Sequence, residues 1–327
     1  MTRTLLANLT TMPTIHRTHF TCLAAAGLLS WSSMVCAAPF AYVPNEGSGT
    51  VSVIDTAGDE VVAEIRAGNK PRGAAISGDW LYISDQPNRL QMIDLKKREP
   101  AASIVLGESP EGVYASPDGR WIATAIEENN DVAITDTRTN QVAFTIKVQG
   151  RNPEHAVFSP DGKKLFVSAE EGGAVDILDF SARRQVAQVP VGARPRGIGF
   201  LPDGSRAYVA AENSSEVYVI DTSTNQLVAH IQAGKRANGI AVHPDGSRVY
   251  VSNGGEGSVS VIDTTDNQII ATIPVGQRPW NMAITPNGAK LYVANGRSNS
   301  VSVIDTVQNV KIGDIPVGKL PWGVVIK

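Results

Sequence analysis

"GQRPWNMAITPNGAKLYVANGRSNSVSVIDT" occupies residues 276–306, and nearly the same text, "GKRANGIAVHPDGSRVYVSNGGEGSVSVIDT", occupies residues 234–264. A chain that repeats itself at a fixed period builds one structural unit several times. The second position of a Leu-Tyr-Val-like strand recurs at intervals of 40, 40, 44, 42, 42 and 42 residues, at Tyr42, Tyr82, Ile122, Phe166, Tyr208, Tyr250 and Tyr292. The Asp that ends a Val-Ile-Asp-like strand recurs at similar intervals, at Asp55, Asp94, Asp136, Asp179, Asp221, Asp263 and Asp305. Both landmarks therefore count seven units.

Each unit consists of short strands and turns. Segments such as "SVSVID" at 258–263 and "QIIATIPVG" at 268–276 are rich in β-branched residues, which favour strands. Pro-Asp-Gly at 117–119, 160–162, 202–204 and 244–246 is typical of tight turns. No segment has a helical apolar stripe. One four-stranded sheet cannot bury both faces alone, so we predict an all-β seven-bladed β-propeller of four-stranded antiparallel blades.

The two ends of the repeat predict how the ring closes. The repeat begins at the second strand of a unit, "FAYVP" from Phe40, and ends with "WGVVIK" at 322–327, which matches the first strand of the other units. The C-terminal strand is therefore expected to complete the N-terminal blade, formed by about residues 40–67. We predict one propeller domain over residues 38–327.

The first 37 residues lie outside the repeat and are expected to be a cleaved secretory signal peptide. They combine few charges with an apolar run near residues 20–29 and small residues around Ala37 and Ala38. A retained membrane anchor is the alternative, although the run is shorter than the roughly 20 residues that span a bilayer. Cleavage would remove Cys22 and Cys36, which are the only cysteines, so no disulfide is expected.

The charge of the mature chain argues against nucleic acid and anionic membranes as partners. Removal of Arg3 and Arg17 takes the Lys+Arg count from 29 to 27, against 32 Asp+Glu. A chain with this acidic balance has no bulk attraction for polyanions. We expect a periplasmic monomer with no membrane span after cleavage.

The repeats carry a family likeness. "LYVANGRSNSVSVIDT", "VYVSNGGEGSVSVIDT" and "AYVAAENSSEVYVIDT" resemble the YVTN family of β-propeller repeats, whereas the third unit has "WIATAI" in place of the Tyr-Val phrase. The stretch from "NGRSNSVSVIDT" to "PWGVVIK" is similar to propeller proteins found beside PQQ-dependent alcohol catabolism. The resemblance implies a periplasmic seven-bladed propeller in such a pathway. Quinoprotein dehydrogenases are instead eight-bladed with a vicinal cysteine pair, so no cofactor is predicted for this chain.

A candidate site follows from the loop that leads from one blade into the next. In this Gly-x-x-Pro-x-Gly phrase the residue after the proline varies, as Arg72, Glu111, Glu154, Arg196, Asn238, Trp280 and Trp322, while His155 and Asn281 replace the usual glycine. The loops between second and third strands are expected to reach the same face of the ring, with Asn45, Asp85, Glu127, Glu170, Glu212, Asn253 and Asn295. Charged groups beside aromatic faces are typical of small-molecule sites. We therefore predict ligand binding at the mouth of the central channel.

Two other interpretations stay open. The arginines could pair with the glutamates only to neutralise a crowded pore, with the tryptophans as packing. Alternatively, His155 and neighbouring carboxylates could act as general acid and base in a hydrolase or lyase. No metal site is predicted, because only three histidines follow the leader and their spacing does not indicate a ligand set. The favoured hypothesis is a non-enzymatic binding or scaffold protein that takes a small molecule or a periplasmic protein partner.

Overall fold

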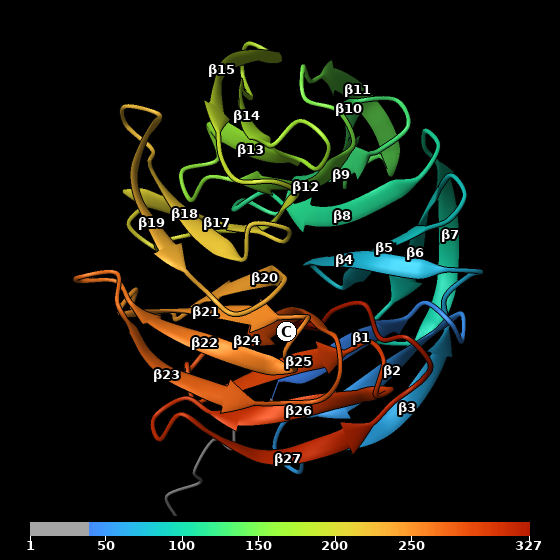
Figure 1. The fold of residues 1–327 in the computed structure, drawn as a ribbon. Coiled ribbons are helices and arrows are strands. Elements are labelled where there is room, and N and C mark those ends of the chain that lie inside the picture. Colours follow the sequence, from blue (N-terminus) through green and yellow to red (C-terminus); the bar gives the residue numbers. More distant parts are fainter. Residues whose placement is uncertain (1–38) are drawn as a thin grey trace, which may run out of the picture. The chain divides into compact units, whose positions relative to one another are not determined.

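The computed structural model describes residues 39–327, which contain 28 strands and no helix. The strands form seven four-stranded antiparallel sheets arranged as blades around an axis (Figure 1). The predicted seven-bladed propeller is therefore confirmed. The predicted signal peptide lies outside the described residues. The described part of the chain contains no helix that is long and apolar enough to cross a membrane.

The first two strands of each blade lie nearest the axis, where first strands of neighbouring blades contact each other (Figure 1). The first strands are β4 (Pro71–Ser77), β8 (Pro110–Ala115), β12 (Pro153–Phe158), β16 (Pro195–Phe200), β20 (Ala237–Val242), β24 (Pro279–Ile284) and β28 (Val325–Ile326). The second strands are β1 (Phe40–Asn45), β5 (Trp80–Asp85), β9 (Trp121–Ile126), β13 (Lys164–Ala169), β17 (Arg206–Ala211), β21 (Arg248–Asn253) and β25 (Lys290–Asn295).

The other two strands of each blade lead outward to the rim of the ring (Figure 1). The third strands are β2 (Thr50–Asp55), β6 (Arg89–Asp94), β10 (Asp131–Asp136), β14 (Ala174–Asp179), β18 (Glu216–Asp221), β22 (Ser258–Asp263) and β26 (Ser300–Asp305). The outer strands are β3 (Glu60–Arg66), β7 (Glu99–Val105), β11 (Gln141–Lys147), β15 (Arg184–Pro190), β19 (Gln226–Gln232), β23 (Ile269–Pro274) and β27 (Val310–Pro316).

The C-terminal strand closes the ring by joining the N-terminal blade. That blade has the strand order β28-β1-β2-β3, with Val325 opposite Tyr42. The N–H of Phe40 donates to the carbonyl of Lys327 (2.7 Å), and the N–H of Lys327 donates back to Phe40 (3.0 Å). The predicted closure is thus confirmed, although the regular strand is only two residues long.

The hydrophobic core is divided among the interfaces between blades. Seven clusters of buried residues occur in the described chain, and each takes its members from two neighbouring blades. At the closing interface, Ala41 and Ile54 of the first blade pack with Tyr292 and Val303 of the last repeat. Burying one large apolar side chain stabilises a fold by roughly 1.5–3 kcal/mol. Because both faces of a blade pack against neighbouring blades, second strands such as β25 are buried along nearly their whole length.

The divergent third unit folds like the others. In three typical blades the hydroxyl of the repeated tyrosine reaches a turn of another blade, as when Tyr82 donates to Asn140 Oδ1 (3.0 Å). In the third blade the equivalent residue is Ala123, one position after the predicted Ile122, and it has no hydroxyl with which to make this bond. Instead, the neighbouring Trp121 packs against Phe144 and Phe180, with ring centroids 5.9 and 5.8 Å away. Aromatic contacts beside this position therefore accompany the loss of the tyrosine.

Candidate functional site

Two families of loops meet at one face of the ring. The carbonyl of the residue before each loop proline accepts a hydrogen bond from the N–H of the residue that follows a second strand. Ser109 accepts from Glu127 (3.0 Å), and Arg194 accepts from Glu212 (2.8 Å). The same bond joins Leu320 to Glu46, which extends the pattern across the closure. The repeated bond holds the two loop families side by side around the channel.

A cavity of about 370 Å³ opens between these loops. Eight of the nine predicted site residues line it, namely Arg72, Glu111, Glu154, Arg196, Asn238, Trp280, Asn281 and Trp322. Glu127 and Glu170 from the second loop family line it as well, and Glu212 is ion-paired to its arginines. His155 is the predicted residue that does not line it.

The residues predicted to reach the cavity from the loops between second and third strands are wrong by one position in four blades. Asn45, Asp85, Asn253 and Asn295 are the last residues of second strands, and none of them lines the cavity. The residues equivalent to Glu127 in those blades are Glu46, Gln86, Gly254 and Gly296. Strand side chains alternate between faces, so a shift of one residue reverses their direction. Asn45, for example, donates to Ser52 Oγ (2.9 Å) within its own blade.

The sequence interpretation also missed four residues that line the cavity: Glu46, Arg194, Arg278 and Leu320. Three of these residues precede the loop proline, with φ angles of 63° (Arg194), 55° (Arg278) and 52° (Leu320). A positive φ at a residue with a Cβ costs of order 1–3 kcal/mol. The sequence carried a signal for these residues, because the residue before the loop proline varies from unit to unit as much as the residue after it.

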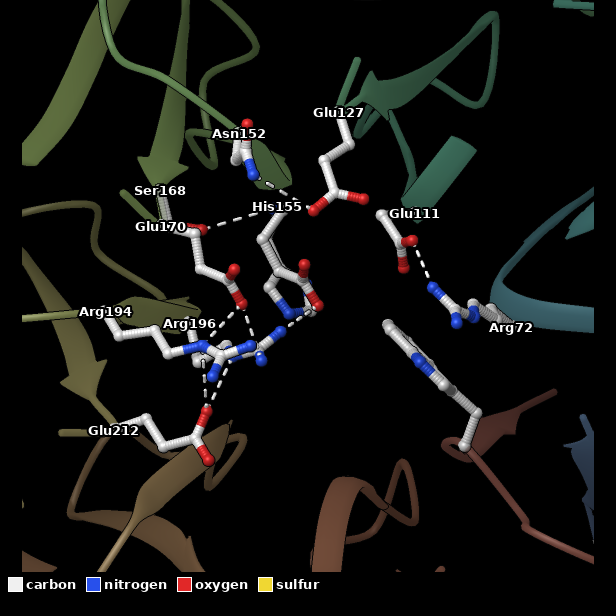
Figure 2. A network of polar contacts seen from close by, with 12 residues as sticks. Arg72, Glu111, Glu127, Asn152, His155, Ser168, Glu170, Arg194, Arg196 and Glu212 are labelled. Carbon is white, nitrogen blue, oxygen red and sulfur yellow. Dashed lines mark hydrogen bonds and ion pairs between the residues drawn. The ribbon is translucent and has the colours of Figure 1, made fainter. Parts of the chain in front are cut away.

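Arg196 is the centre of an ion-pair network on one side of the cavity (Figure 2). Its guanidinium contacts Glu154 Oε1 at 2.5 Å, Glu170 Oε1 at 2.6 Å and Glu212 Oε2 at 3.0 Å. These three carboxylates outweigh burial and raise the pKa of Arg196. A guanidinium presents five N–H donors in a rigid fork, which suits such a multiple contact. Arg196 is therefore a charged and fixed element of the wall.

Two more arginines balance the charge of these carboxylates. Arg194 Nε lies 2.8 Å from Glu170 Oε1, and Arg278 Nη2 lies 2.7 Å from Glu212 Oε1. Burial opposes ionisation of Glu212, yet Arg196 and Arg278 together hold its pKa below the ordinary value. Three arginines thus face three glutamates in this half of the cavity, and Arg236, which does not line it, approaches Glu212 at 3.8 Å.

The opposite half of the cavity has more carboxylates than arginines. Arg72 pairs with Glu111 (Figure 2). It also pairs with Glu46 at 3.2 Å. Glu127 accepts a hydrogen bond from Ser109 Oγ (2.8 Å) and has no arginine partner among residues 39–327. Burial, reinforced by the charge of Glu154, raises the pKa of Glu111 in spite of Arg72. Burial also raises the pKa of Glu127.

The third wall of the cavity is neutral and largely aromatic, formed by Trp280, Trp322, Asn238 and Asn281. Asn238 is only 5% exposed, and its side-chain amide has no hydrogen-bond partner among residues 39–327. Trp322 and Asn281 also line a second cavity of about 100 Å³, whose other walls include apolar residues of the first strands. These two side chains therefore lie between the polar cavity at the channel mouth and a smaller, more apolar cavity.

His155 is buried and does not face the cavity as the sequence suggested. It is 1% exposed, its Nδ1 lies 2.8 Å from Tyr114 Oη, and its ring centroid is 5.8 Å from that of Trp322. Burial, with a smaller contribution from the Arg196 cation, lowers the pKa of His155 to about 3. The imidazole is thus neutral at physiological pH and a weak general base. No group of three or more His, Cys, Asp or Glu in the described chain is arranged to hold a metal ion.

The buried imidazole predicts a loss of stability in mild acid. An unfolded histidine takes up a proton near pH 6.5, whereas folded His155 resists protonation down to about pH 3. Its stabilising contribution is complete above about pH 6.5 and falls as the pH drops through this window. Between pH 7 and pH 5 we expect this residue to cost the native state about 2 kcal/mol.

Urea denaturation at pH 7 and pH 5 measures this cost. His155→Gln should lose about 2 kcal/mol less than the wild type between the two pH values. His230→Gln is the control, because it removes an exposed imidazole and leaves residue 155 intact. Equal pH dependence in wild type and His155→Gln would show that residue 155 does not titrate differently on unfolding.

Comparisons with solved structures support the propeller. The chain is 22% identical to Kuenenia stuttgartiensis hydrazine synthase, covering 81% of this chain and 92% of that one with a TM-score of 0.75. A functionally unknown protein from Desulfotomaculum acetoxidans is 20% identical (88% and 98% covered, TM-score 0.76). Dihydro-heme d1 dehydrogenase NirN, solved in complex with DHE, is 15% identical (88% and 74% covered, TM-score 0.65). At these identities the likeness shows the fold alone.

Comparisons with sequences add one finding. No curated protein matches the chain. The family model described as "Lactonase, 7-bladed beta-propeller" matches residues 178–314, which run from the end of β14 into β27. The match and the seven observed blades together establish a seven-bladed β-propeller that is similar, over this part, to the lactonase propellers.

Proposed function

We propose that this protein is a non-enzymatic binding protein that takes a small polar molecule into the cavity at the channel mouth. The observation that carries the proposal is Asn238, a nearly buried amide without a hydrogen-bond partner in the described chain, on the wall of a cavity of about 370 Å³. The amide opens onto the cavity, so a ligand there gains a directional hydrogen-bonding group that no protein group already occupies.

The composition of the cavity wall supports binding over catalysis. The lining residues are Glu, Arg, Asn, Trp and Leu, so the cavity wall has no Ser, Thr or Cys nucleophile, and most of its glutamates are ion-paired with arginines. The arginines are held by carboxylates, so the site is organised before a ligand arrives. Preorganised sites bind with a smaller loss of conformational entropy.

A thermal-shift screen of small metabolites with three proteins tests this proposal. Compounds that raise Tm in the wild type should lose their effect in Asn238→Trp, whose indole fills the cavity. Asn213→Trp is the matched control, because Asn213 is an exposed residue that does not line this cavity. Unliganded Tm values report whether each variant folds. Compounds that stabilise Asn238→Trp as well as wild type, or no stabilising compound at all, would contradict the proposal.

Lactone hydrolysis is the second candidate, favoured by the family match over residues 178–314. Its acid or base would be Glu111 in place of His155, because Glu111 lines the cavity and burial raises its pKa toward the working range of a general acid. The assay is hydrolysis of δ-gluconolactone by wild type and Glu111→Gln. Loss of about 100-fold in rate would favour hydrolysis, and an absence of wild-type turnover would exclude this substrate.

The same proposal includes export to the periplasm and a role in a PQQ-linked alcohol oxidation pathway. The leader-like residues 1–37 and the C-terminal resemblance described above support it. Cell fractionation with N-terminal sequencing checks the first part, since a mature chain beginning at Ala38 is expected. A chain found in the cytoplasm with its leader intact would reject it.

A further inference from the structure

The charges around the cavity are unevenly divided. On one side Arg194, Arg196 and Arg278 face Glu154, Glu170 and Glu212, with contacts of 2.5–3.0 Å at Arg196. On the other side Arg72 is the one arginine lining the cavity near three carboxylates, Glu46, Glu111 and Glu127. The second side therefore has two more acidic than basic groups. An added positive charge would correct the imbalance.

The same side has more hydrogen-bond acceptors than donors. Ser109 Oγ lies 2.8 Å from Glu127 Oε2 and 3.4 Å from Glu111 Oε1, although a hydroxyl has a single proton to donate. Within the described chain, the Oε2 atoms of Glu46 and Glu111 have no hydrogen-bond partner. The cavity thus offers free carboxylate oxygens. Each of its arginines is ion-paired with a glutamate, and the two N–H groups left without a partner in the described chain, at Arg72 Nε and Arg278 Nη1, are buried.

The aromatic wall suits a cation with an apolar part. Trp280 and Trp322 both line the cavity. The face of an indole attracts a positive charge, by roughly 0.5–2 kcal/mol depending on exposure. An anion would compete with the glutamates for the arginines and would increase the excess of negative charge. A hard metal ion would find no ligand on the indole wall.

We infer that the ligand of this cavity is an organic ammonium compound, with its charged nitrogen between Glu111 and Glu127 and its apolar part against Trp322. The nearly buried, unpaired amide of Asn238 is an independent sign of an occupant and binds a polar group elsewhere on the same molecule. The inference rests on the proposed binding function and specifies the chemical class of the ligand.

Isothermal titration calorimetry with three matched probes tests the inference. The purified protein is titrated at pH 7.5 with benzylammonium, benzyl alcohol and benzoate, which differ mainly in charge. Benzylammonium should bind at least about tenfold more tightly than benzyl alcohol, which corresponds to about 1.4 kcal/mol. Benzoate should show no saturable binding. The difference between benzylammonium and benzyl alcohol should shrink as salt is added, because salt screens exposed charges.

Two substitutions locate the binding. Glu127→Gln keeps the shape of the side chain and removes its charge, so it should weaken benzylammonium about tenfold and leave benzyl alcohol unchanged. Glu171→Gln is the control, because Glu171 is exposed and does not line this cavity. Asn238→Trp should abolish binding of every probe that enters the cavity.

The possible failures are distinguishable. If benzoate or benzyl alcohol binds at least as tightly as benzylammonium, and Asn238→Trp abolishes that binding, the cavity is a binding site and the inferred charge of the ligand is wrong. If benzylammonium binds equally well to Glu127→Gln, the nitrogen does not lie at this carboxylate and the inference is rejected. If no probe binds and the metabolite screen finds no compound that binds at the cavity, both the inferred ligand class and the proposed binding function are rejected.

Discussion

Deletion of residues 322–327 is expected to abolish cooperative unfolding of the propeller. The deletion removes β28 and the backbone bonds that join Lys327 to Phe40 and Trp322 to Pro44 (2.9 Å). It also removes Trp322, and large-to-small changes at packed aromatic residues cost about 3–5 kcal/mol. Without β28, β1 loses its hydrogen-bonded neighbour and becomes the inner edge of the first blade, and the contacts of β28 with β24 and β4 are lost.

Differential scanning calorimetry of the full chain and the deletion measures this effect. We expect a transition at much lower temperature, with a van't Hoff enthalpy well below the calorimetric enthalpy. Lys327→Ala is the control, because it removes the exposed contact of Lys327 Nζ with Asp79 (3.2 Å) and keeps the backbone bonds. A deletion that melts like the full chain would mean that β28 does not hold the ring closed.

Arg196→Met is expected to destabilise the protein by about 3–5 kcal/mol, because it leaves buried carboxylates without their cation. Glu154, Glu170 and Glu212 all contact this guanidinium, and the side chain of Glu212 is fully buried. Arg194 and Arg278 remain, but they approach Glu170 and Glu212 and leave Glu154 unpaired. The loss should be smaller at low pH, where the orphaned carboxylates take up protons.

Urea denaturation of Arg196→Met and two comparison variants distinguishes the loss of the buried ion-pair network from the loss of a surface charge. Arg151→Met removes an exposed arginine whose contact with Glu171 is 3.6 Å, and it should change stability by less than about 0.5 kcal/mol. Arg196→Lys should fall between the two methionine variants, since an ammonium keeps the charge and loses the fork of donors. A change below about 1 kcal/mol for Arg196→Met would indicate that the network is not buried in solution.

The fold could be predicted from the sequence because a period of about 42 residues repeats every local signal seven times. Errors in a single unit are corrected by the other units, as in the third blade, where the structure places Ala123 rather than the predicted Ile122 at the tyrosine position and the blade still forms. Closure was predictable because the first strand missing at the N-terminus reappears at residues 322–327.

The candidate site was harder to predict than the fold. The residue after each loop proline could be placed because proline opens the first strand and fixes the register near the axis, as at Arg72 and Arg196. The second loop family has no such marker, so the sequence did not show where each second strand ends, and Asn45, the last residue of β1, was selected in place of Glu46. His155 illustrates a different limit, because only the packed structure reveals that Tyr114 and Trp322 surround it. The role of all these residues in binding stays a prediction.

The central claim is that the channel-mouth cavity holds a small molecule, and a crystal structure of the protein grown with benzylammonium tests it most directly. The account predicts difference density inside the cavity, with the ring against Trp322 and the nitrogen within hydrogen-bond reach of Glu111 and Glu127. An empty cavity at saturating benzylammonium, or density only on the outer strands, would contradict the account.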